Sequence, residues 1–303
     1  MGQGTIHLFR FAGVDLFLHW SWFLVAVYEI RGRSGSYPSV VWNVLEYLAL
    51  FLIVTLHEYG HALACRSVGG KADRIVLWPL GGVAYVDPPP RPGATLWSIA
   101  AGPLVNFVLL FLLSLVGIWD RSIAWNIAYP NAHALLRAVW FINLGLLIFN
   151  LLPIYPLDGG QILRSLLWYG VGRARSLMAA TVVGFVGVAG LIVVAVWIRS
   201  VWFGILAAFI LMNCWGGLRQ AQALARIAKL PRREGFACPS CQSAPPVGGY
   251  WVCGRCRKPF DTFQSQAVCP NCGEQFAVTL CPDCGAVNPI SAWRAAALAS
   301  TKL

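Results

Sequence analysis

The chain has 303 residues, of which 58% are apolar and only 12% are charged. An average soluble domain carries roughly 25% charged residues, so this composition excludes an ordinary soluble protein and favours one embedded in a lipid bilayer. The formal net charge of +11 does not indicate a nucleic-acid-binding protein. Most Lys and Arg residues lie in short loops between apolar runs, where they set the orientation of a membrane protein instead of forming one basic face.

Six apolar runs are long enough to cross a bilayer as helices, which takes roughly 17 to 25 residues. They cover about residues 14–30, 40–65, 94–119, 134–152, 174–198 and 201–218. A short helix is also predicted at 161–168, before the fifth run. We therefore expect an all-α polytopic membrane protein with about six transmembrane helices. No cleavable signal peptide is expected, since only Arg10 precedes the first run and no small-residue cleavage site follows it.

The distribution of basic residues between the two sides of the membrane predicts the orientation. With six spans, both termini lie on one side, and that side carries most of the Lys and Arg residues near the spans: Arg10, Arg66, Lys71, Arg74, Arg91, Arg164, Arg173, Arg175, Arg219, Arg226, Lys229, Arg232 and Arg233. The opposite side holds Arg31, Arg33, Arg121, Arg137 and Arg199. The positive-inside rule then predicts a multi-pass protein of the cell membrane with cytosolic N- and C-termini, provided that no span is miscounted.

The loop between the second and third runs has the composition of a β hairpin. Residues 75–86 are rich in β-branched and aromatic side chains, and Pro79 and the pair Gly81-Gly82 interrupt them. We predict a short hairpin at the membrane face.

The second run contains His57-Glu58-Tyr59-Gly60-His61. On a helix, residues four apart face the same way, so both imidazoles can bind one Zn²⁺. Glu58 lies one residue along, where its carboxylate can take a proton from a zinc-bound water. The same pattern also arises by chance in soluble helices. Inside a span, however, an ionisable residue costs about 2.5–3.5 kcal/mol on the insertion scale and usually marks function.

Zinc with two protein ligands needs a third, and Asp158 is the leading candidate. It lies at the end of the fourth run, in Asn150-Leu-Leu-Pro-Ile-Tyr-Pro-Leu-Asp-Gly-Gly160. Pro153 and Pro156 should break the helix there, and Gly159-Gly160 allows another segment to approach closely. Two His, one carboxylate and one open position describe a hydrolytic zinc site. The alternative is an ordinary Pro/Gly turn with a solvated Asp.

These motifs, together with Ala101-Gly-Pro-Leu-Val-Asn106 and Leu18-His-Trp-Ser-Trp22, resemble the site-2 protease family of intramembrane zinc metalloproteases over about residues 6–225. The resemblance implies cleavage of a single-pass membrane protein within or near its transmembrane helix. It implies that Asn150 positions the substrate or the oxyanion, and that the Gly81-Gly82 segment is an edge strand holding the substrate extended. Asn106 is expected near the site as a substrate-binding residue, or as a polar residue bonding between helices.

The C-terminal region contains four Cys-x-x-Cys units, which are typical of zinc ribbons. We predict one structural Zn²⁺ on Cys238, Cys241, Cys253 and Cys256, and another on Cys269, Cys272, Cys281 and Cys284. An interleaved grouping is also possible, whereas disulfides are disfavoured in a cytosolic tail. With the intramembrane site, this predicts one catalytic and two structural zinc ions.

The expected organisation is a transmembrane metalloprotease domain at 1–230, a double zinc ribbon at 236–288 and a C-terminal tail at 289–303. The ribbon has too small a charge excess for nucleic acid, so a protein partner is expected for it. Two alternatives to a protease are an inactive relative that binds membrane proteins as a scaffold, and a zinc sensor or carrier. The presence of Glu58 argues against the scaffold, which has no need of a buried base.

Overall fold

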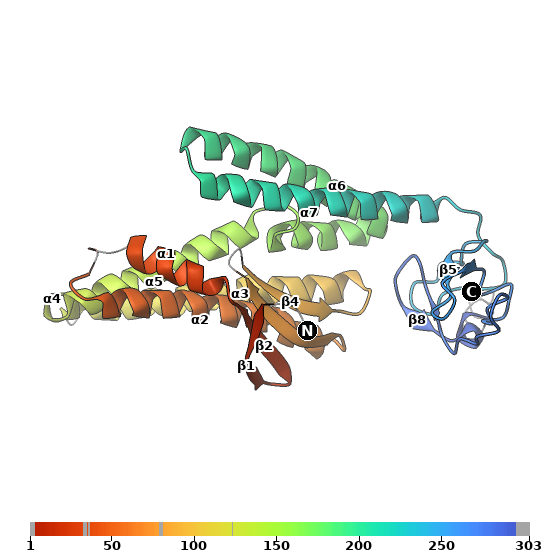
Figure 1. The fold of residues 1–303 in the computed structure, drawn as a ribbon, viewed down its shortest axis with the longest axis horizontal. Helices are drawn as coiled ribbons and strands as arrows, with labels where there is room; N and C mark the ends of the chain where they lie inside the picture. The colour runs from red at the N-terminus through yellow and green to blue at the C-terminus, as the bar shows by residue number, and fades with distance from the viewer. Residues whose placement is uncertain (1–3, 33–34, 36, 79–80, 123, 295–303) are drawn as a thin grey trace. The chain divides into compact units, whose positions relative to one another are not determined.

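The computed structural model describes residues 4–32, 35, 37–78, 81–122 and 124–294. The chain forms two compact units, which are described separately below. The first unit contains Met1–Leu166 with Ala180–Cys214, and the second contains Leu167–Ala179 with Trp215–Leu303. Figure 1 shows the helices and strands in chain order.

Five helices in the described part of the chain are long and apolar enough to cross a membrane. They are α2 (Val40–Ser67), α3 (Pro92–Ser122), α5 (Pro130–Leu151), α6 (Asp158–Trp197) and α7 (Val201–Ala228), with the short α4 (Trp125–Ala128) between α3 and α5. Gly172 has φ 80° and ψ 170°, which interrupts α6. The short predicted helix and the fifth predicted span are therefore the two parts of α6.

The first predicted span, 14–30, is wrong as a transmembrane helix. It consists of strand β2 (Val14–His19) followed by α1 (Trp22–Gly32), a helix of 11 residues. Such a helix is about 16 Å long, which is shorter than the hydrocarbon core of roughly 30 Å. Burial alternates along β2, with Val14, Leu16 and Leu18 buried. This period of two is the signature of a strand, and the apolar composition of the run conceals it.

Strand β2 and helix α1 nevertheless run beside α2, in the opposite direction. The Tyr59 hydroxyl donates to the carbonyl of Val14 at 3.4 Å, and the Tyr47 hydroxyl donates to that of Trp22 at 3.2 Å. The amide of Asn43 donates to the carbonyl of Ile30 at 3.3 Å. The chain from β2 through α1 thus reaches from the C-terminal half of α2 to its first turns.

The predicted hairpin is present as β3 (Lys71–Trp78) and β4 (Gly81–Asp87), while Pro79 lies outside the described residues. It belongs to a larger sheet with the order β1-β2-β3-β4, in which β1 covers Thr5–Phe11. Strands β2 and β3 are parallel, and the other pairs are antiparallel. The buried face of this sheet packs on α2, and β4 lies at its edge.

The Cys-rich part contains two small hairpins within the second unit. They are β5 (Trp251–Val252) with β6 (Pro259–Phe260), and β7 (Thr279–Leu280) with β8 (Val287–Asn288). Trp293 is fully buried beside Phe236 and Phe263 in the apolar core of this part. The segment 289–303, predicted as a tail, therefore packs into the ribbon core as far as Trp293, and residues 295–303 lie outside the described part.

Candidate metal centre

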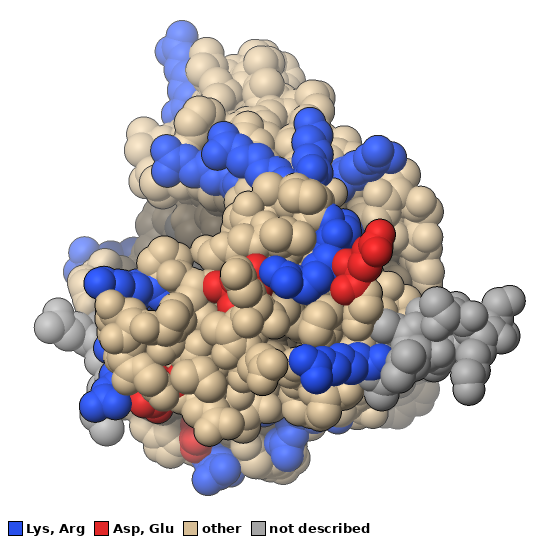
Figure 2. All heavy atoms as spheres, turned by 90° about the vertical axis from the view of Figure 1, so that its right-hand side faces the viewer, with Lys and Arg blue, Asp and Glu red and all other residues tan. Residues whose placement is uncertain are grey.

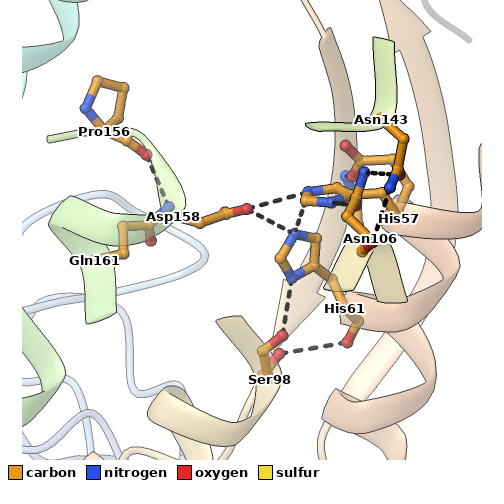
Figure 3. Close-up of polar contacts among 10 residues, drawn as sticks. His57, His61, Ser98, Asn106, Asn143, Pro156, Asp158 and Gln161 are labelled. Carbon is orange, nitrogen blue, oxygen red and sulfur yellow. Dashed lines mark hydrogen bonds and ion pairs between the residues drawn. The ribbon is translucent and has the colours of Figure 1, made fainter. Parts of the chain in front are cut away.

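The predicted ligands of the intramembrane site lie together in the first unit. His57 and His61 come from consecutive turns of α2, and Asp158 is the first residue of α6 (Figure 3). The Nε2 atoms of His57 and His61 lie 3.0 Å apart. The Oδ2 atom of Asp158 lies 3.1 Å from Nε2 of His57 and 3.4 Å from Nε2 of His61. Two imidazoles and one carboxylate thus converge on one point.

Small residues allow the helices to approach closely enough to form this site. A Cβ atom at Gly60 would lie 2.8 Å from the carbonyl oxygen of Ala101 in α3, and one at Gly102 would fall on the imidazole of His61. On α6, a Cβ atom at Gly159 would collide with the carbonyl of Leu151. These glycines therefore bring α3, and the chain before α6, against the ligands.

The surroundings of the ligands fit a zinc ion. The backbone carbonyl of Ser98 lies 2.9 Å from Nδ1 of His61, and because a carbonyl only accepts, Nδ1 carries the proton and Nε2 has its lone pair facing Asp158. The Oδ2 atom of Asp158 is buried and has no hydrogen-bond donor. A buried carboxylate oxygen facing two imidazole lone pairs would be repulsive without a cation between them. The three residues thus form a donor set suited to Zn²⁺.

Glu58 follows His57 in α2, is buried, and interacts electrostatically with the three candidate ligands. Its Oε2 atom accepts a hydrogen bond of 2.9 Å from the backbone N–H of Ala84 in β4. A Cβ atom at Gly82 would collide with the Glu58 carboxylate, so the glycine permits the strand to lie over this side chain. The edge strand and the candidate base are therefore in direct contact.

The other residues predicted for the site differ in their contacts with the candidate ligands. Asn106 is fully buried and its Oδ1 atom lies 2.6 Å from Nδ1 of His57, so it contacts a candidate ligand. It also bonds to Asn143 of α5, which fits the expected bond between helices, and its substrate-binding role stays a prediction. Asn150 lies in the last turn of α5 and is partly exposed. Gly81 begins β4, opposite Trp78.

Two contacts of the site were missed by the sequence reasoning. Asn143 of α5 is fully buried and bonds to Asn106, and its polar side chain inside the fourth predicted span was a usable signal. Ser98 contacts His61 through its backbone carbonyl, which no residue type can indicate.

The Cys residues form two groups, but not the predicted ones. The outer group is Cys238, Cys241, Cys281 and Cys284, and the inner group is Cys253, Cys256, Cys269 and Cys272. Sulfur atoms within a group lie 3.6–3.8 Å apart across the paired units. A tetrahedron with Zn–S bonds of 2.3 Å has an edge of about 3.8 Å, so both groups have the size of a zinc site.

The sequential grouping is therefore wrong, and the reason lies in the repeated local structure. In every Cys-x-x-Cys unit, the first Cys N–H donates to the carbonyl five residues later, as Cys238 does to Ser243 at 3.0 Å and Cys281 to Ala286 at 2.8 Å. Four locally identical units contain no information on how they pair. The pairing is visible only in contacts between segments distant in sequence, such as that of Arg232, which precedes the first unit, with Asp283 of the fourth unit at 2.5 Å. This hydrogen bond raises the pKa of Arg232.

The apolar helices define a multi-pass membrane protein, and two His with one carboxylate form a possible zinc site within it. The chain belongs to peptidase family M50, the site-2 protease family, whose model matches residues 46–123 and 115–194. It is 38% identical over 181 residues to a zinc metalloprotease of Methanocaldococcus jannaschii, which covers 59% of this chain. It spans about half (50%) of that relative's length.

A second relative and a solved structure support the assignment. A putative zinc metalloprotease of Bacillus subtilis is 30% identical over 168 residues, which are 45% of this chain and 76% of that protein. The solved structure of a site-2 protease from Methanocaldococcus jannaschii superposes with a TM-score of 0.51 at 28% identity, covering 71% of this chain and 95% of that one. The membrane fold is therefore that of the family.

The contact at Gly102 makes a prediction about zinc binding. Gly102→Ala should strongly weaken zinc binding at the intramembrane site, because the new methyl group displaces the His61 ring. The matched control is Gly117→Ala in the same helix, where a Cβ atom meets nothing within 4 Å. Zinc retained after dialysis against a chelator measures the effect. Equal retention by both variants would contradict the close approach of α3 to the ligands.

Proposed function

We propose that this protein is an intramembrane zinc endopeptidase, which cleaves a single-pass membrane protein within or near its transmembrane segment. One observation carries the proposal: the buried carboxylate of Glu58 lies beside a convergent set of two imidazoles and a carboxylate at membrane depth. A buried acid that is not needed as a ligand is costly inside a span and serves proton transfer in hydrolytic sites. A scaffold or a zinc carrier would have no use for it.

The candidate ligands and Glu58 have different roles in the proposed reaction. His57, His61 and Asp158 would hold Zn²⁺, which when bound lowers the pKa of water and polarises a carbonyl. Glu58 takes a proton from the attacking water and later delivers it to the amine that leaves. The N–H of Ala84 donates to Oε2 of Glu58, and this contact fixes the position of the carboxylate.

Strand β4 is suited to binding the substrate. A transmembrane helix has all its peptide groups bonded internally, so a protease must hold it extended before cleavage. An edge strand offers unpaired N–H and C=O groups to an extended segment, and β4 lies at the edge of the sheet and against Glu58. We assign substrate positioning to the Gly81-Gly82 segment and to Asn150, which is eight residues before Asp158. A protein partner is proposed for the ribbon, and the lipid bilayer surrounds the helices.

We further propose that both termini are cytosolic. Although α1 is too short to be a standard span, β2 and α1 run beside α2 from its C-terminal half to its first turns, so the chain still changes sides before α2 begins. The loops then lie on the same sides of the membrane as predicted from six spans, so the positive-inside rule still places both termini in the cytosol. Figure 2 shows a view of the chain with more Lys and Arg than Asp and Glu side chains, in line with the net charge of +11.

The test is cleavage by purified protein combined with a count of zinc. In proteoliposomes with a panel of tagged single-pass segments, the full chain should cut at least one within its apolar region, as located by mass spectrometry. It should contain three zinc ions, one at each ligand group. A His57→Ala, His61→Ala variant should contain two and cut nothing. Cleavage by this variant equal to that of the parent chain would refute the proposal.

A further inference from the structure

The candidate ligand His57 is connected to two buried amides that lie outside the ligand set. Asn106 of α3 and Asn143 of α5 are both fully buried. The Nδ1 atom of His57 lies 2.6 Å from Oδ1 of Asn106, and the amide nitrogen of Asn106 donates to Oδ1 of Asn143 at 2.9 Å. The amide nitrogen of Asn143 donates in turn to the backbone carbonyl of Asn106 at 2.8 Å. Figure 3 shows this chain of contacts beside the metal ligands.

The chemistry of the last acceptor fixes the direction of every bond in the chain. A backbone carbonyl only accepts, so the Asn143 atom that faces it must be the NH₂ group. The other Asn143 atom is then the oxygen, and it requires the NH₂ group of Asn106. Consequently the oxygen of Asn106 faces Nδ1 of His57, which must carry the proton. Nε2 of His57 is left with its lone pair pointing toward Asp158 and His61.

We propose that Asn143 and Asn106 are positioning residues that act as an amide relay and set the tautomer of His57. The relay selects the only neutral form of the imidazole that can bind a metal through Nε2. It rests on the proposed zinc site and deepens it, because it assigns a role to two residues outside the ligand set.

The two imidazoles depend on different kinds of partner. His61 donates to the backbone carbonyl of Ser98, whose direction is set by helix α3 and cannot rotate. The Asn106 amide can rotate by half a turn and present NH₂ in place of oxygen. Its bond to Asn143 opposes that rotation, because the flipped amide would place two oxygens against each other. His57 is therefore the ligand whose tautomer depends on side chains.

A role limited to joining α3 and α5 would not need the contact with His57. An Asn pair can bond across helices with either amide orientation, and such bonds occur widely between transmembrane helices. Here Asn143 bonds to the backbone carbonyl of Asn106. At the other end of the pair, the Asn106 side chain bonds to Nδ1 of His57, the ring nitrogen that faces away from the proposed metal position. Bonds of this kind from outside the ligand set typically change metal affinity by about 10–100-fold.

The first measurement is the protonation of His57 in the zinc-free full chain. The chain has five His, so the ¹⁵N spectrum of protein labelled at the imidazole nitrogens is simple, and a His57→Ala spectrum assigns the signals. We expect the proton of neutral His57 on Nδ1 in the parent chain. In Asn143→Leu, we expect both tautomers to be populated. A proton on Nε2 in the parent chain would overturn the proposal without reference to any variant.

The second measurement is zinc affinity by chelator competition. Asn106→Leu and Asn143→Leu should bind about 10–100-fold more weakly at the intramembrane site. Asn143→Asp should stay near the parent value, because a neutral carboxylic acid at this position still accepts from the Asn106 amide and donates to the Asn106 carbonyl. The matched control is Asn213→Leu, which removes an amide that bonds only within its own helix, to Phe209 at 2.8 Å. Should Asn143→Asp lose affinity as much as Asn143→Leu, the residue is structural and the relay is refuted.

Neither readout uses proteolysis. A chain that binds zinc through the relay but cleaves nothing would disprove the proposed function and leave the relay intact. Conversely, a chain that cleaves its substrate and has unchanged zinc affinity in Asn143→Leu would disprove the relay alone.

Discussion

Replacing Glu58 with Gln is expected to lower the rate of substrate cleavage by about 10²–10⁴-fold, the range that a positioned general base contributes. The amide has nearly the same shape as the carboxylate, and its oxygen can still accept the bond from the N–H of Ala84. The side chain should therefore keep its place while losing the ability to take a proton. Since Glu58 is not a proposed ligand, the zinc content should be unchanged at three ions per chain.

The matched control for this variant is Glu46→Gln. Glu46 is a second buried acid in α2, and it accepts a hydrogen bond of 2.8 Å from the hydroxyl of Tyr37, away from the ligands. The same change at this position tests whether a lost charge in the helix is enough to stop cleavage. Full cleavage by Glu58→Gln, or equal losses in both variants, would exclude Glu58 as the base.

The parts of the site that could be predicted are those set by local periodicity. His57 and His61 are four residues apart in an apolar run, so a helix of any kind places them on one face. Asp158 needed more: a helix break at Pro153 and Pro156, and small residues at which another segment could approach. The contact of Gly159 with the carbonyl of Leu151 is the close approach that this composition indicated.

The features that escaped prediction depend on tertiary contacts. Residues 14–19 are apolar enough to be taken for the start of a span, and their pairing with β1 and β3 makes them a strand. Ser98 acts through its backbone, and Asn143 acquires its role from the position of Asn106 on another helix. The membrane helices and the ligands are local properties of the sequence, whereas the sheet and the shell around the ligands are not.

The grouping of the Cys residues predicts how many zinc ions are retained by two variants in which four Cys are replaced with Ser. Removing all four outer Cys residues, with Ser at 238, 241, 281 and 284, should reduce the zinc content from three ions to two. Placing Ser at 238, 241, 253 and 256 should reduce it from three to one, since each ribbon site then keeps only two thiolates. Sequential grouping predicts one ion in the first variant and two in the second, and interleaved grouping predicts one ion in both variants. Elemental analysis of the purified chains therefore separates all three arrangements.

The same variants should differ in the stability of the ribbon. Binding of structural zinc contributes about 10–16 kcal/mol in small zinc domains, far more than a core built around Phe236, Phe263 and Trp293 can supply alone. The variant with Ser at 238, 241, 253 and 256 should thus expose the chain beyond about residue 231 to limited proteolysis. The outer-site variant should retain a protected core around Cys253 and Cys269, because the inner zinc still joins these two units. Equal protection in both would mean that apolar packing, and not zinc, holds the ribbon together.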